Sequence, residues 1–119
     1  MGRASALIWF GLAMLIAVPA TSAPMKLEGM GYQRARKVIL GYGWKPVSAN
    51  CYGINKKTCA QFPEIQSCSG VDPGYCGMIF ARKDRCLYIG TSGGPPENLE
   101  EGDTHVTSVT FHAGPCFKG

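Results

Sequence analysis

Six cysteines constrain the fold of this 119-residue chain more than any other feature. They stand at Cys51, Cys59, Cys68, Cys76, Cys86 and Cys116. An even number of cysteines in a small exported chain predicts a disulfide framework, whereas in a reducing compartment it would suggest metal binding or catalysis. The compartment therefore decides how these residues are interpreted.

The first 23 residues have the pattern of a secretory signal peptide. Arg3 supplies a positive charge, and an uninterrupted apolar run follows at residues 6–18. Small residues at positions 21–23 then suit a signal peptidase. The apolar run is shorter than the roughly 20 residues that cross a bilayer. We therefore expect residues 1–23 to be removed, leaving residues 24–119 without a membrane span in the periplasm or outside the cell.

Cleavage after residue 23 leaves one small disulfide-bonded domain, residues 24–119, whose core is marginal for its size. Removal of Arg3 lowers the net charge from +4 to +3. Lysines and arginines crowd the first half of this domain, and acidic residues crowd a later loop at Glu97, Glu100, Glu101 and Asp103. Two interpretations remain open: two solvated faces, or a dipolar surface that orients a charged partner.

The cysteine spacing favours short bridges in the irregular part of the chain, Cys51–Cys59 and Cys68–Cys76. An antiparallel return of the last strand would bring Cys116 beside Cys86. A nested pairing, Cys59–Cys68 with Cys51–Cys76, remains open. The chain contains no Cys-x-x-Cys and no His-x-x-x-His pair, so we expect neither a metal site nor a cofactor.

Apolar residues at helical spacing predict a helix over residues 32–42. Its apolar face comprises Tyr32, Ala35, Val38, Ile39 and Tyr42, and its polar face Gln33, Arg34, Arg36 and Lys37. An extended segment at 44–47 and an irregular region at 49–75 follow. Strands are then predicted at 77–81, 86–91 and 105–112. The expected fold is α+β: one amphipathic helix packed on a small antiparallel sheet of three to four strands and braced by disulfides.

Residues 32–47 resemble the opening of a group of small exported proteobacterial proteins. The shared features are a Tyr-x-x-Ala-Arg helix (residues 32–36), a Gly-Trp-x-Pro exit (43–46), Phe-Pro-Glu (62–64) and Cys-x-Gly (68–70). The group is uncharacterised, so the resemblance implies export and this architecture and carries no activity across.

Catalytic groups are sparse. His105 and His112 lie an odd number of positions apart in one predicted strand, so we expect their side chains on opposite faces. An acid–base pair of histidines therefore fits poorly, and an even cysteine count leaves no thiol nucleophile. We expect no catalytic residues.

Aromatic and basic residues around the cysteine-rich region are the other signal for function. Trp44, Lys45, Tyr52, Lys56 and Lys57 could form one binding surface. Such a surface suits an acidic protein or an anionic glycan of the cell envelope, and the modest net charge argues against nucleic acid. The sequence therefore favours an exported non-catalytic binding module: an envelope accessory protein, an inhibitor or an immunity-type protein. The alternative is a small secreted hydrolase acting on nucleic acid or cell wall.

Overall fold

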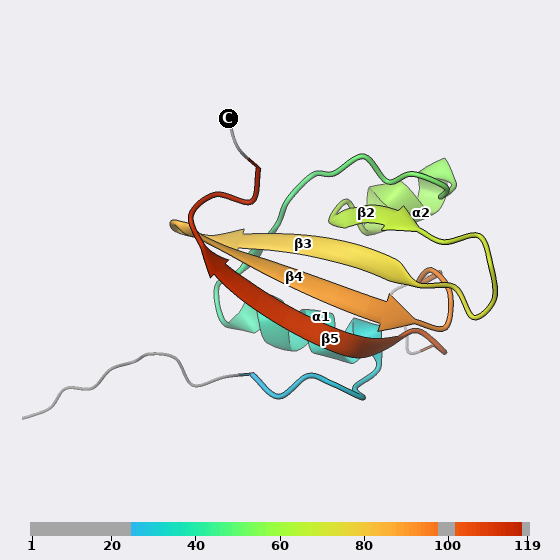
Figure 1. Ribbon diagram of the computed structural model, residues 1–119, viewed down its shortest axis with the longest axis horizontal. Helices are drawn as coiled ribbons and strands as arrows, with labels where there is room; N and C mark the ends of the chain where they lie inside the picture. The colour runs from blue at the N-terminus through green and yellow to red at the C-terminus, as the bar shows by residue number, and fades with distance from the viewer. Residues whose placement is uncertain (1–24, 98–101, 118–119) are drawn as a thin grey trace, which may run out of the picture.

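A computed structural model describes residues 25–97 and 102–117. The expected signal peptide, residues 1–23, lies outside the described residues. The described chain is a small α+β domain with an antiparallel sheet of five strands, two helices and three disulfides (Figure 1). The α+β class and the disulfide bracing are confirmed, and the sheet is larger than predicted.

Strand β3 is the centre of the sheet. The strands are β1 (Lys45–Pro46), β2 (Ile65–Cys68), β3 (Cys76–Arg82), β4 (Arg85–Ser92) and β5 (His105–Ala113). β1 and β2 both pair with one edge of β3, β2 near its beginning and β1 near its end. β4 pairs with the other edge, and β5 is the outermost strand. All pairs are antiparallel.

Helix α1 (Tyr32–Gly41) lies against one face of the β3–β4–β5 sheet (Figure 1). Tyr32, Ala35 and Ile39 are fully buried there. They meet a set of buried side chains from the sheet: Met78, Phe80, Leu87, Ile89 and Val106. This interface is the apolar core, and it makes a short helix stable that would be marginal alone.

The polar face of α1 differs from the prediction at two positions. Gln33 is 5% exposed and Arg36 is half-buried, although both were assigned to solvent. Tyr42, assigned to the apolar face, follows the helix and is 51% exposed. The buried stripe is therefore rotated toward Gln33 and Arg36. Arg36 has polar partners there, because it donates to the Glu64 carboxylate and to the Gln61 carbonyl.

Residues 49–75 are more regular than their composition suggests. They contain helix α2 (Lys56–Gln61) and strand β2, neither of which was predicted. Asn55 caps α2, since its side-chain oxygen accepts a hydrogen bond from the Thr58 backbone N–H at 2.8 Å. The cap compensates for the shortness of this six-residue helix.

The favoured disulfide pairing is confirmed. The bridges are Cys51–Cys59, Cys68–Cys76 and Cys86–Cys116. Cys86 pairs with His112 across β4 and β5, so the chain after β5 returns beside it as expected. Three disulfides fit an oxidising extracellular compartment. Across residues 25–97 and 102–117, neither helix has the length and apolar character needed to cross a membrane.

Candidate functional site

The motif residues of the α1 helix and of the Phe-Pro-Glu segment converge in one buried cluster. Glu64 is fully buried, and its carboxylate accepts a hydrogen bond from the Tyr32 hydroxyl at 2.6 Å. Arg36 donates to the same carboxylate, from Nε at 2.6 Å and from Nη2 at 3.2 Å. The Arg36 guanidinium also lies 5.1 Å from the centre of the Phe62 ring. These contacts join α1 to residues 61–64.

The electrostatics of this cluster favour a structural role. Burial and the neighbouring Glu64 carboxylate raise the pKa of Tyr32 well above its ordinary value, so the hydroxyl remains a donor. Burial alone would lower the pKa of Arg36, but the hydrogen bond and charge of Glu64 outweigh it and raise the pKa. A fully buried carboxylate held by two donors has no access to a substrate. We therefore assign Tyr32, Arg36 and Glu64 to fold specification.

The two histidines do not form a catalytic pair, although for a different reason than predicted. A β-bulge in β5 shifts the register between Val106 and Ser108. His105 therefore faces Ser92 and His112 faces Cys86, which are six residues apart in β4. By register both histidines lie on the same face, which corrects the expectation of opposite faces. They stand about 20 Å apart along the strand, too far to act on one bond.

The five residues predicted to bind do not form a single surface. Trp44 is 5% exposed and packs on Phe111, with ring centres 5.8 Å apart, so it belongs to the core. Lys45 pairs with Ala81 at the end of β3. Tyr52, which is 65% exposed, bridges to Ser67 beside the beginning of β3.

Lys56 and Lys57 follow Tyr52 by four and five residues, inside the loop that the Cys51–Cys59 disulfide closes. Both lysines are exposed on α2. Ala81 and the residue beside Ser67, Gly77, are four positions apart in β3, about 13 Å. Tyr52, Lys56 and Lys57 thus share one disulfide-closed loop, and Lys45 lies apart from it.

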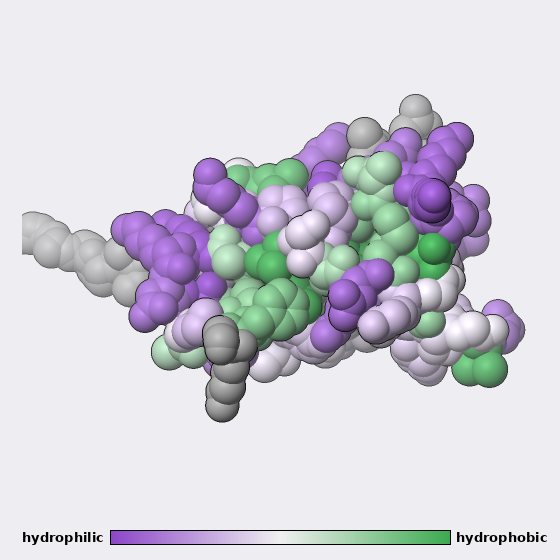
Figure 2. Space-filling view, turned by 90° about the horizontal axis from the view of Figure 1, so that it is seen from above, coloured by the Kyte–Doolittle hydropathy of each residue, from purple (hydrophilic) through white to green (hydrophobic). Residues whose placement is uncertain are grey.

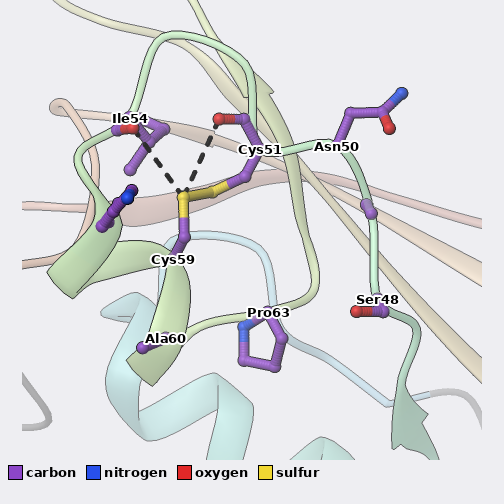
Figure 3. Close-up of a pocket in the computed structure, with 9 residues that line it drawn as sticks. Ser48, Asn50, Cys51, Ile54, Cys59, Ala60 and Pro63 are labelled. Atoms are coloured by element: carbon purple, nitrogen blue, oxygen red, sulfur yellow. Dashed lines mark hydrogen bonds between the residues drawn. A yellow bond between two sulfur atoms is a disulfide. The ribbon is translucent and has the colours of Figure 1, made fainter.

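A pocket of about 490 Å³ lies beside this group, between α2 and the segment 48–51. Its lining residues are Ser48, Ala49, Asn50, Cys51, Ile54, Lys56, Cys59, Ala60 and Pro63. Figure 3 shows the Cys51–Cys59 disulfide joining α2 to the segment 48–51 at the edge of the pocket and the Ser48 side chain pointing toward Pro63, while Asn50 points away. Of these lining residues, all within the described chain, Lys56 alone carries a charge.

Two residues of the pocket wall are held by their surroundings: Pro63 by the buried cluster beside it, and Cys51 in a strained backbone conformation. Pro63 stands between Phe62 and Glu64, which are both fully buried, and its carbonyl accepts a hydrogen bond from the Ala49 N–H at 3.1 Å. Cys51 has a φ of 57°, a left-handed conformation that is unfavourable for a residue other than glycine. Such strain persists where the surroundings hold it, and it is concentrated at functional sites.

Hydrophilic residues gather at the two ends of one face of the molecule. Figure 2 shows one group at the end where Figure 1 places the β3–β4 turn, and another at the end where it places α2, with a mixture of hydrophobic and hydrophilic residues between them. The turn contributes Arg82, Lys83 and Arg85, all exposed. The sequence pattern alone does not predict that these cations belong to a site. Their clustering follows from the two-residue turn that joins β3 to β4.

No family model, no curated protein and no solved structure matches this chain. Within residues 25–97 and 102–117, no group of His, Cys, Asp and Glu side chains is arranged to hold a metal ion. The function is therefore inferred from the pocket and its surroundings.

Proposed function

We propose that this protein is an exported, non-catalytic binding module that holds an anionic group of a cell-envelope protein or glycan in the pocket between α2 and residues 48–51. The observation that carries the proposal is a pocket of about 490 Å³ with Lys56 on its wall. Lys57 and Tyr52, in the same loop closed by the Cys51–Cys59 disulfide, add a second exposed cation and an exposed aromatic ring.

The chemistry of the pocket suits an anion carried by a larger molecule. Lys56 provides the charge, and the Ser48 hydroxyl provides a hydrogen-bond donor on the opposite wall. Tyr52 can pack against a sugar ring or an apolar side chain at low entropic cost. Because the pocket is open to solvent and shallow, affinity would come from several such contacts together.

Export supports this assignment. The signal-peptide pattern of residues 1–23 and the three disulfides both favour an oxidising destination, and the resemblance to small exported proteobacterial proteins supports the proposal of a periplasmic or extracellular location. A rigid scaffold braced in this way loses little entropy on binding.

The test is a binding titration with two probes, a soluble acidic peptide and soluble peptidoglycan fragments. Replacing Lys56 and Lys57 by Ser should weaken binding of one probe at least about tenfold, and binding by the native protein should weaken with salt, since exposed charges are screened beyond about 8–10 Å at physiological ionic strength. The matched control replaces Lys26 and Lys37, two exposed lysines elsewhere, by Ser. Equal weakening by the two double variants would show a net-charge effect and would refute the pocket.

The hydrolase alternative is tested with the same proteins. His105→Ala with His112→Ala should leave binding unchanged, because both side chains are exposed and lie outside the pocket. Cleavage of RNA or peptidoglycan by the native protein, lost in this histidine variant, would overturn the non-catalytic assignment.

A further inference from the structure

Most of the outer edge of β5 is open. The beginning of the strand is covered by residues 29–32: the Gly29 N–H donates to the Val106 carbonyl at 2.8 Å, and the Val106 N–H donates to the Met30 carbonyl at 2.9 Å. Beyond Val106, β5 pairs with β4 alone within the described residues. Residues 107–113 therefore present an unpaired strand edge.

The backbone groups that point outward along this edge can be identified. Val106 directs both backbone groups outward: its N–H donates to the Met30 carbonyl, and its C=O accepts from the Gly29 N–H. The Gly114 N–H points inward, since it donates to the Asp84 carbonyl at 2.7 Å. Backbone direction alternates along a strand, so counting back from Gly114 places the N–H and C=O of Val109 and Phe111 on the outer side. The extra residue of the bulge at 106–108 explains why the outward-pointing residue before it, Val106, has an even number and those after it have odd numbers.

Beyond the bulge at 106–108, this edge lacks the features that usually prevent strand edges from pairing. Exposed edges are commonly protected by lysine, proline, a β-bulge or a very short strand. Residues 107–113 read Thr-Ser-Val-Thr-Phe-His-Ala, with no lysine, arginine, carboxylate or proline. All seven are at least partly exposed, and Phe111 is 37% exposed. Side chains of this kind have high β propensity and favour strand pairing.

We propose that β5 pairs antiparallel with β5 of a second copy of this chain, about a two-fold axis at Thr110. In this register Val109 of each copy stands opposite Phe111 of the other. These are the residues whose backbone groups point outward, so the register forms four hydrogen bonds between the copies. It also makes two pairs of a β-branched with an aromatic side chain, which stabilise antiparallel strands.

Self-complementarity favours a second copy over an unrelated strand. Val109 and Phe111 lie on the same face of the sheet as Trp44, which packs on Phe111. Pairing about Thr110 therefore continues this apolar surface from one copy into the other. An isologous interface of this type is the commonest in soluble oligomers.

The charges at the two ends of β5 also favour the antiparallel arrangement. Arg85 pairs with Ala113 at the C-terminal end, close to Arg82 and Lys83, and these three cations outnumber the exposed Asp84 of the same turn. Exposed acidic residues, Glu28 and Asp103, stand near the N-terminal end. Antiparallel pairing directs the net basic end of one copy toward the acidic residues at the N-terminal end of the other.

The test is sedimentation equilibrium of the exported, oxidised protein. Native protein should form a dimer, and Thr110→Lys should raise the dissociation constant at least about tenfold, because it places like charges opposite each other at the axis. Thr110 is exposed, so this change should leave the monomer folded. The control, Val71→Lys, adds the same charge on a distant loop where Val71 is 69% exposed, and should leave the dimer unchanged.

Two further measurements fix the register. An equimolar mixture of Thr110→Lys and Thr110→Glu should restore the dimer, because opposite charges then meet at the axis. The amide hydrogens of Val109 and Phe111 should exchange slowly in concentrated protein and faster on dilution. A native protein that stays monomeric at millimolar concentration, or a dimer unaffected by Thr110→Lys, would overturn the proposal. So would a β5 edge that pairs only with an added extended peptide.

Discussion

Glu64 is a charged residue with no exposed surface, and two side chains of α1 make its burial tolerable. An ionised carboxylate is expensive to bury unless it is paired and hydrogen-bonded. Tyr32 and Arg36 satisfy it, and they are the first and last residues of the Tyr-x-x-Ala-Arg motif. The motif residues are thus explained by the demands of the fold. They connect α1 to residues 61–64, and Pro63 within this segment lines the pocket.

Replacing Arg36 by Met should destabilise the protein by about 3–5 kcal/mol, because it leaves the Glu64 charge buried without its cation. Arg34→Met, which removes an exposed cation two positions earlier, should cost less than about 0.5 kcal/mol. Urea unfolding with the disulfides intact measures both values. Comparable losses for the two variants would mean that the Arg36–Glu64 ion pair contributes nothing specific.

The raised pKa of Tyr32 predicts a loss of stability at alkaline pH. The folded state binds the hydroxyl proton more tightly than the unfolded state, whose tyrosine pKa is about 10. This contribution is therefore complete below pH 10 and declines as the pH rises above it. Tyr32→Phe should lack this part of the decline and should lose about 1.5–3 kcal/mol at neutral pH, since Glu64 loses a hydrogen bond. Parallel pH profiles for the two proteins would contradict the assignment.

Among the elements, those with strong periodicity were predictable and those defined by tertiary contacts were not. The helix at 32–41 and the strands β3, β4 and β5 were each placed within two residues. The helix has apolar residues at helical spacing, β3 and β4 flank a short polar turn, and β5 is rich in β-branched residues. β2 has four residues and a bulge against β3, too short for a pattern. α2 could have been found from its capping residue, since Asn55 precedes Lys56 and its side chain bonds to Thr58.

The binding residues show a similar division. Tyr52, Lys56 and Lys57 lie within one loop, closed by the Cys51–Cys59 disulfide, and their role in binding stays a prediction. Trp44 was misplaced because a tryptophan beside a lysine suits a surface as well as a core, and its partner Phe111 comes from a distant strand. The histidines were predicted on opposite faces because strict alternation along the strand was assumed, and the sequence does not reveal the bulge that breaks it.

Asn55 links the stability of α2 to the pocket. Asn55→Ala should cost about 1 kcal/mol, since it removes the side-chain cap of the helix. Fraying of the first turn would also displace Lys56, so we expect weaker anion binding. Thr107→Ala serves as the control, because Thr107 is exposed in β5 and does not line the pocket. Chemical denaturation and the binding titration together decide whether the cap affects both properties.

For the whole molecule, the disulfides divide into one that connects distant segments and two that brace local ones. Cys86–Cys116 spans 30 residues and ties the segment after β5 to β4. Cys51–Cys59 and Cys68–Cys76 each span 8 residues and lie in the region that was predicted to be irregular. A marginal core of this size needs such bracing. The three bridges should therefore differ in what they contribute.

Removing Cys86–Cys116 by two alanine substitutions should destabilise the protein by about 3.6 kcal/mol, and removing Cys51–Cys59 by about 2.5 kcal/mol, because a longer loop restricts the unfolded chain more. Anion binding should respond in the opposite order. Cys51 and Cys59 both line the pocket and their bridge joins α2 to the segment 48–51, so its loss should weaken binding even under conditions where the variant is fully folded. Calorimetry and the peptide titration, performed on both double variants, separate the two effects. If the Cys86–Cys116 variant bound as weakly as the Cys51–Cys59 variant while both remained folded, the pocket beside α2 would not be the binding site.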